Sequence, residues 1–113
     1  MPDNKKVMSL ERVGSKSKIV KIKFIKEVPA TRSAAYIAAA FNKCFKHSIY
    51  KIIIDMENIN SSLHNNFIAT IIEATTKVRR QKGDIKIINL SELAEQAFTG
   101  FNAFSYLTIT PMD

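Results

Sequence analysis

The sequence predicts an α/β fold, with a four- to five-stranded mixed sheet and helices packed mainly on one face of it. Strand-like and helix-like segments alternate along the chain after a starting hairpin, and such alternation is typical of a parallel sheet with crossover helices. A length of 113 residues, with 46% hydrophobic and 24% charged residues, fits one soluble domain. We therefore expect a single domain over residues 1–113, in which residues 1–17 hold the N-terminal segment and the first strand.

Two segments predict the hairpin. Residues 7–13 are the first strand candidate. Residues 18–28 alternate in polarity, with apolar side chains on one face and lysines on the other: Val20, Ile22 and Phe24 against Lys21 and Lys23. A period of two predicts a half-buried strand, and we expect Pro29 to end it.

The next two elements are a helix and a central strand. Thr31 is a suitable N-cap, and apolar residues recur at helical spacing as far as Phe45, so we expect a helix that ends near 47–48. Residues 49–55 are β-branched and nearly all apolar. This composition predicts a central strand that is buried on both faces.

The second half repeats the alternation. A polar loop at 56–66 precedes a helix with a clear apolar stripe, for which Gly83 is the expected C-cap. Residues 84–90 predict another strand, Ser91 is placed to cap a short third helix, and residues 106–110 predict a short final strand.

The positive charge of the chain is concentrated near its N-terminus. The formal net charge is +7, and residues 1–26 contain eight of the 17 basic residues but two of the ten acidic ones. Such a segment can form a solvated strand face, or it can attract nucleic acid or another anionic surface. Phe24, on the apolar face of the predicted strand, is the only aromatic residue among these basic residues, so the stacking platform of a single-strand binder is missing.

Residue types that support catalysis are sparse. Three isolated glycines cannot build a phosphate-cradling loop, and the single cysteine, Cys44, excludes an internal disulfide and is expected to be a buried structural thiol. His47 and His64 have no partners at metal-ligand spacing and are expected to be exposed. We expect no metal, no cofactor and no enzyme activity. No apolar run is long enough to span a membrane, and we expect a cytoplasmic protein.

The end of the central strand and the loop after it form the candidate site. Asp55 and Glu57 follow the strand where α/β folds commonly place functional residues. The Ser- and Asn-rich loop then leads into the N-terminus of a long helix, where free N–H groups and the helix dipole favour an anion. A role for Asp55 in a turn or a cap is an alternative to a functional role.

The ordered set of elements resembles the STAS domain, the fold of bacterial anti-sigma factor antagonists. Residues 52–59, Ile-Ile-Ile-Asp-Met-Glu-Asn-Ile, are similar to the hydrophobic strand of that family and its Asp-Leu-Ser-x-Val ending. Residues 83–91 resemble the second core strand and its helix cap. Residues 97–101, Ala-Phe-Thr-Gly-Phe, match a Leu-Phe-x-x-x-Gly-Leu ending with two residues fewer before the glycine. The resemblance extends from about residue 18 to residue 109.

The resemblance implies a non-enzymatic regulatory module that binds a protein partner, such as an anti-sigma kinase or a similar ATPase-fold protein. The implied binding face is the loop at 56–66 and the helix start after it, with the candidate contact residues Asp55, Glu57, Asn58, Asn60, His64, Asn65 and Asn66. The basic excess predicts a partner of acidic character. The sequence leaves a homodimer open.

The family carries a phosphorylation switch that this chain does not clearly retain. In the family, an Asp-Ser-Ser-Gly tetrapeptide opens the helix, and a partner kinase phosphorylates its first serine. The nearest match here, Asn60-Ser61-Ser62-Leu63, makes Ser61 and Ser62 the candidate phosphoacceptors, with helix capping as their alternative role. Counting from Asp55 or from Gly83 instead places the tetrapeptide at 63–66 or 64–67, where no serine occurs.

Two other functions are compatible with the sequence. The first is a STAS subunit that docks on an ABC transporter ATPase or joins a signalling assembly without phosphorylation. The second is a small basic nucleic-acid-binding domain that uses the N-terminal lysines, although the missing aromatics make nucleic acid a less favoured partner. Steep salt dependence of binding would distinguish the nucleic-acid function from a docked protein interface.

Overall fold

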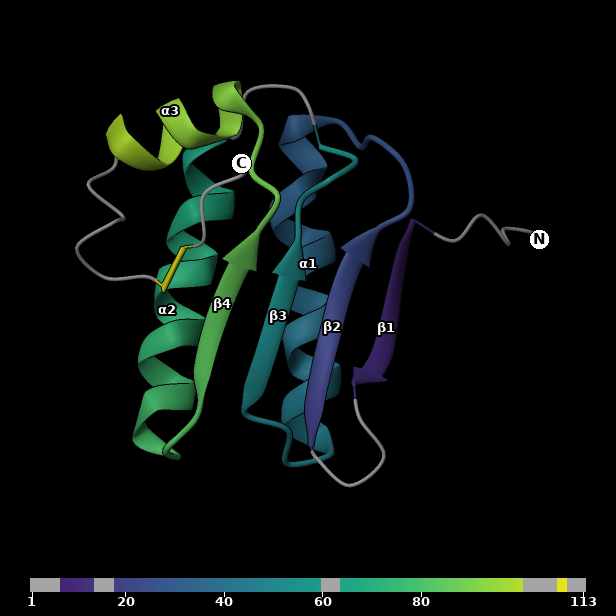
Figure 1. Cartoon of the computed structure of the whole chain (residues 1–113), viewed down its shortest axis with the longest axis vertical. Helices are drawn as coiled ribbons and strands as arrows, with labels where there is room; N and C mark the ends of the chain where they lie inside the picture. The colour runs from purple at the N-terminus through teal and green to yellow at the C-terminus, as the bar shows by residue number, and fades with distance from the viewer. Residues whose placement is uncertain (1–6, 14–17, 60–63, 101–107, 110–113) are drawn as a thin grey trace.

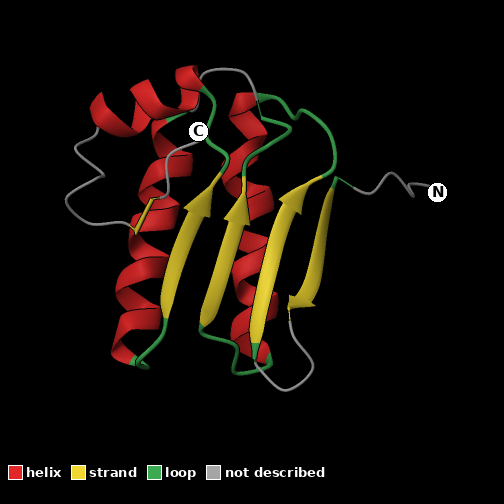
Figure 2. Cartoon of the chain, in the orientation of Figure 1, coloured by secondary structure: helices red, strands yellow, loops and turns green. Residues whose placement is uncertain are grey.

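The computed structural model describes residues 7–13, 18–59, 64–100 and 108–109. Strands and helices alternate after the hairpin (Figures 1 and 2), in the order β1 (Met8–Val13), β2 (Ile19–Phe24), α1 (Ala30–Lys46), β3 (Lys51–Asp55), α2 (Asn65–Arg80), β4 (Asp84–Ile88), α3 (Glu92–Gly100) and β5 (Thr108–Ile109). The five strands form one sheet in the order β1-β2-β3-β4-β5, so β3 is central. The predicted fold class is confirmed.

The direction of the strands places the helices. Strands β1 and β2 are antiparallel, and each later pair is parallel. Because every parallel crossover steps in the same direction across the sheet and crossovers are right-handed, α1 and α2 must lie on the same face. Figure 2 shows both long helices behind the sheet, with the other face of the sheet uncovered.

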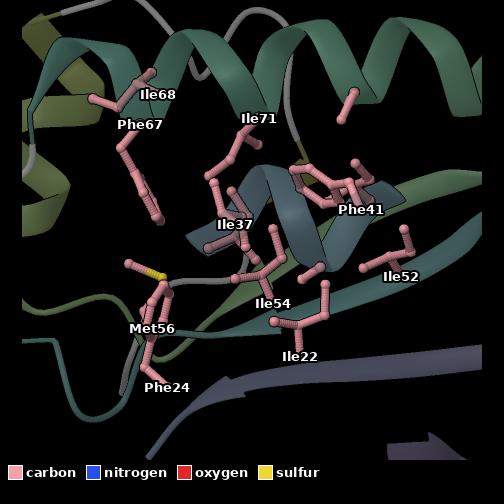
Figure 3. Close-up of a cluster of buried hydrophobic side chains, with 14 of the residues drawn as sticks. Ile22, Phe24, Ile37, Phe41, Ile52, Ile54, Met56, Phe67, Ile68 and Ile71 are labelled. Carbon is pink, nitrogen blue, oxygen red and sulfur yellow. The ribbon is translucent and has the colours of Figure 1, made fainter. Parts of the chain in front are cut away.

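The core lies between this sheet and the two long helices. Apolar side chains at every second position of β2 and β3 point toward the helices, and Figure 3 shows Ile22, Ile52 and Ile54 facing the side chains of α1 and α2. Ile22, Ile54 and Phe67 are fully buried. These side chains hold α2 against the middle of the sheet.

One predicted property of the central strand is wrong. Residues 49–55 were expected to be buried on both faces, yet Ile53 is only half-buried and Lys51 is exposed. The helices cover a single face of the sheet, so alternate residues of β3 face the uncovered side. An apolar residue at position 53 therefore forms part of a surface.

Two strands are shorter than the sequence predicts. β2 ends at Phe24 instead of residue 28, because its partner strand β3 ends at Asp55, which pairs with Lys23. β4 ends at Ile88 instead of residue 90, because Asn89 takes a left-handed conformation with φ of 59°. Of the predicted final strand at 106–110, Thr108–Ile109 is β5 and the rest lies outside the described residues.

The start of α1 also differs from the prediction. Thr31 lies inside the first turn instead of at the N-cap, which is Pro29 with φ of −58° and no side-chain capping bond. Proline suits this position because its φ is already fixed near the helical value and its missing N–H would have no partner there.

Helix α2 ends in a Schellman motif (two backbone hydrogen bonds that close a helix terminus). The N–H of Gly83 donates to the carbonyl of Val78 at 2.8 Å, and the N–H of Lys82 donates to that of Arg79 at 3.1 Å. The prediction placed glycine at the cap, but Lys82 takes the left-handed conformation, with φ of 63°. Gly83 is needed for a different reason: a Cβ there would collide with the backbone carbonyl of Tyr50.

Candidate functional site

The candidate site lies where the parallel strands end at their carboxyl side. The chain leaves β3 at this end, and α2 begins there (Figure 1). The site has two described parts, the turn at residues 55–59 and the helix start at residues 64–67. The candidate residues Asn60, Ser61 and Ser62 lie outside the described residues.

Asp55 is the centre of the first part. It is 2% exposed, and its Oδ1 accepts hydrogen bonds from the backbone N–H of Glu57 at 3.0 Å and from Nδ2 of Asn89 at 3.1 Å. Its Oδ2 lies 3.5 Å from Nζ of Lys21. The bond to residue 57 closes a turn of the kind that Asp and Asn side chains form with the backbone two residues later. The structural role considered for Asp55 is thus present.

These contacts keep Asp55 ionised. Burial by itself raises the pKa of a carboxyl, but the hydrogen bonds from Asn89 and from the Glu57 amide, with the charges of Lys21 and Lys23, outweigh it. The pKa of Asp55 therefore lies below its ordinary value. The carboxylate is a fixed negative charge and not a proton donor at neutral pH.

Glu57 points to the surface and pairs with a lysine of the neighbouring strand. Nζ of Lys23 lies 3.0 Å from Oε1 of Glu57, and this hydrogen bond, with the charge of Glu57, raises the pKa of Lys23. Lys23 stands opposite Asp55 in the parallel register of β2 and β3. The two carboxylates thus neutralise the lysines at this end of the sheet.

The turn is attached to both neighbouring strands. Nδ2 of Asn58 donates to the carbonyl of Phe24 at 2.8 Å, beyond the end of the β2–β3 ladder. On the other side, the N–H of Met56 donates to the carbonyl of Ile88 at 3.0 Å. With Met56 and Ile59 buried, the backbone of this segment has one defined course. The polar residues of the turn are therefore presented on a rigid support.

The second part is the start of α2. His64 is the N-cap, and its Nδ1 accepts from the N–H of Asn66 at 3.2 Å. Phe67 is fully buried, with its ring centroid 6.0 Å from that of Phe24. This anchor fixes the first turn, in which His64, Asn65 and Asn66 are exposed. The helix start thus offers two amide side chains and no acidic residue.

Sequence analysis identified the residues of the turn and the helix start but not the groups that hold them. Lys21, Lys23 and Asn89 all contact the turn, and none was a candidate. The sequence does contain a signal for the two lysines: their face of β2 and the carboxylate at the end of β3 become neighbours once the two strands are aligned in parallel.

The reactive side chains of the described residues are not gathered into a metal site. They contain no set of three or more His, Cys, Asp or Glu side chains that could hold a metal. Cys44 is buried, as predicted, and burial raises the pKa of its thiol. His47 and His64 are exposed, as predicted. No described helix has the length and apolar character that crossing a membrane requires.

Comparison with known proteins identifies the fold. No family model matches the sequence, and no curated protein matches it either. Among solved structures, a candidate anti-sigma factor antagonist from Thermotoga maritima superposes with a TM-score of 0.78 at 13% identity, covering 93% of this chain and 86% of that one.

Two further solved structures have the same fold. The anti-sigma factor antagonist SpoIIAA, in its unphosphorylated form, has a TM-score of 0.71 at 14% identity, covering 92% of this chain and 88% of that one. A STAS domain protein from Planctomyces limnophilus has a TM-score of 0.66 at 14% identity, covering 94% and 91%. The chain described here therefore has the STAS fold, as the resemblance implied.

Proposed function

We propose that this protein is a cytoplasmic, non-enzymatic regulator that binds an anti-sigma kinase or a similar ATPase-fold protein, as an anti-sigma factor antagonist does. The fold shared with solved antagonists supports the proposal. The observation that carries the proposal is that the candidate surface is held in place from below. Asp55 fixes the turn and Phe67 fixes the helix start, and each of these two segments has exposed polar residues. A preorganised polar surface without catalytic groups suits recognition.

The proposal includes binding that does not depend on a phosphoserine at the helix start. His64 occupies the N-cap, and the residues after it are Asn65 and Asn66. This supports the alignment that places the tetrapeptide at residues 64–67, where no hydroxyl stands. Ser61 and Ser62 precede the cap and are the only serines of the loop.

Binding is tested with purified ATPase-fold proteins from the same genome, anti-sigma kinases and transporter ATPases alike, by isothermal titration calorimetry. We expect one of the kinases to bind with micromolar affinity or better. Asn65→Asp adds a negative charge at the helix start, where the dipole stabilises it, so the fold is retained. Because this charge changes the recognition surface, we expect binding about tenfold weaker or worse.

A matched control separates the surface from net charge. Asn42→Asp makes the same chemical change on an exposed position of α1 and should leave the affinity unchanged. Equal loss in both variants, or the absence of binding to every ATPase-fold protein of the genome, would contradict the proposed function. Selective binding to a transporter ATPase would identify that ATPase, and not a kinase, as the partner.

The phosphorylation state is tested separately. The protein is incubated with its kinase partner and ATP, and phosphate is mapped by mass spectrometry. We expect no phosphate on Ser61 or Ser62, and we expect the Ser61→Ala/Ser62→Ala variant to bind as the wild type does. Stoichiometric phosphate on either serine, with regulation lost in the alanine variant, would show that the switch is retained.

A further inference from the structure

A second surface lies at the opposite end of the sheet from the candidate site. Two adjoining hollows of about 320 and 250 Å³ lie at the amino end of the strands and share Ile19, Lys51, Lys82 and Gly83. The larger opens on the uncovered face, and the smaller extends toward Ser48 and Gln81 at the ends of the two long helices. Half-buried Ile19 and Ile53 line this region, and exposed lysines surround them: Lys18, Lys51, Lys82 and Lys86. We call these residues the basic hollow.

The lysines of the basic hollow differ from those at the other end of the same face. Lys21 and Lys23 have carboxylate partners, Asp55 and Glu57. None of the ion pairs within the described part of the chain involves a lysine of the basic hollow, and the nearby Asp84 is bound by Arg79 at 3.0 Å. The positive charge here is therefore available to a binding partner.

Helix α3 has the complementary surface. Glu92 is exposed, Leu93 is 50% exposed and Glu95 is half-buried. Ala94 and Phe98 are buried and attach the helix to the core. The helix contains no basic residue. Glu92 and Glu95 lie about one turn apart on the same side of the helix, and Leu93 lies on the flank next to Glu92. This side of α3 therefore combines carboxylates with an aliphatic edge, as the hollow combines lysines with an aliphatic floor. Figure 1 shows α3 at the carboxyl end of the sheet, so it cannot reach the basic hollow of its own molecule.

We propose that α3 of one molecule docks into the basic hollow of a second copy, so that the protein associates head to tail. Glu92 and Glu95 face Lys51 and Lys86, and Leu93, at the edge of the contact, covers the exposed part of Ile19, the residue that pairs with Lys51. The two surfaces of the interface are different, so the association is heterologous, and a dimer keeps one free hollow and one free α3 surface. The contact is small and charged, which predicts weak association that salt reduces.

Binding of single-stranded nucleic acid is a less favoured function for this surface. The aromatic ring among the residues that line the two hollows is that of Tyr50, which is half-buried and stacked with Phe45 at a ring-centroid distance of 6.0 Å, so it is not presented as a platform for a base. The aliphatic floor would gain nothing from phosphates, whereas it is buried by a leucine side chain.

The test uses sedimentation velocity over a concentration series in 50 mM and 500 mM salt. We expect concentration-dependent association of the wild-type protein at low salt that weakens at high salt. The hollow variant, Lys51→Glu/Lys86→Glu, and the helix variant, Glu92→Lys/Glu95→Lys, should each associate about tenfold more weakly or less, since like charges then face each other.

Mixing the two variants is the decisive measurement. In an equimolar mixture, the acidic α3 of the hollow variant meets the basic hollow of the helix variant, and the lysine-bearing α3 of the helix variant meets the acidic hollow of the hollow variant. Because both contacts pair opposite charges, the mixture should associate at concentrations at which each variant alone does not. This result also shows that both variants are folded. A control with the same charge change on α1, Arg32→Glu/Lys43→Glu, should associate as the wild type does.

Three outcomes would overturn the proposal. They are a wild-type protein that stays monomeric at millimolar concentration in low salt, association that persists in both variants, and a mixture that stays monomeric. Binding of a single-stranded oligonucleotide by the monomer, lost in the hollow variant, would assign the surface to nucleic acid instead.

Discussion

Asp55 holds a negative charge at a position that is almost closed to water. Its two oxygens face the Asn89 amide, the Glu57 backbone N–H and the Lys21 ammonium group. A buried charge is tolerated when hydrogen bonds and opposite charges replace the lost hydration. Asp55, which the sequence indicated as a candidate for partner contact, therefore has a structural role: it shapes the turn to which we assign recognition.

Asp55→Asn should lower the free energy of unfolding by about 1–2 kcal/mol at pH 7, because charge-assisted hydrogen bonds become neutral ones. The folded pKa lies below the unfolded value, so the stabilisation by the carboxylate is present above the unfolded pKa. It is lost as the pH falls below about 4 through the folded pKa. Urea denaturation at pH 7 and pH 3 should show a difference between wild type and variant that shrinks in acid.

The exposed Glu57 is the control for this prediction. Glu57→Gln removes a surface ion pair with Lys23 and should change stability little at either pH. If Asp55→Asn were as harmless as Glu57→Gln, the contacts of Asp55 would contribute nothing to the fold.

At the scale of one element, the start of α2 depends on a cap of unusual type. His64 accepts one hydrogen bond through Nδ1, whereas Asp, Ser and Asn are the preferred caps. We expect His64→Ala to lower the free energy of unfolding by about 0.5–1 kcal/mol and His64→Asp to raise it by a similar amount, since Asp caps well and its charge suits the dipole. Thermal and urea denaturation of the three proteins check this order. An alanine variant as stable as the wild type would show that the cap is not used.

The end of the same helix gives a second prediction. Gly83→Ala should cost about 1–3 kcal/mol of stability, because the added methyl group meets the backbone of Tyr50, which cannot move without disturbing β3. The neighbouring Lys82→Gly should be neutral or stabilising by up to about 1 kcal/mol, since glycine takes the left-handed conformation without strain. Denaturation curves of both variants test these separate roles of Lys82 and Gly83. A destabilising Lys82→Gly together with a harmless Gly83→Ala would contradict them.

Elements with a strong periodic pattern were predictable, and contacts that depend on register were not. The alternation in β2 and the apolar stripe of α2 each predict an element that the structure contains. The cap at Pro29 was missed because the backbone, and not a side chain, begins α1. The network around Asp55 joins residues 34 positions apart, and only the pairing of β2, β3 and β4 brings them together.

At the scale of the whole molecule, the helices cover one face of the sheet and leave the other face open. Adjacent residues of β3 show this difference directly. Ile54 faces the helices and is fully buried, whereas Ile53 faces the uncovered side and is half-buried. We expect Ile54→Ala to cost about 3 kcal/mol or more and Ile53→Ala about 1 kcal/mol. Equal losses by urea denaturation would mean that the second face is covered in solution, for example by another copy.

The same one-sidedness separates the two surfaces proposed above. The candidate contact residues lie at the carboxyl end of the strands, and the basic hollow lies at their amino end. The variants of one surface should therefore leave the other unaffected. Binding to an ATPase-fold partner by the hollow variant, with wild-type affinity, would support this independence.

The strand order β1-β2-β3-β4-β5 has a consequence for the synthesis of the protein. Every strand is hydrogen-bonded only to strands that precede or follow it directly along the chain, so no strand has to be inserted between two that have already paired. The sheet can grow outward from the hairpin in the order in which the ribosome releases it, with each helix covering the newly added strand. At each stage of synthesis, the partly formed sheet has one edge at which the next strand is still to be added. This limits the unpaired strand surface that is open to misassembly before synthesis is complete.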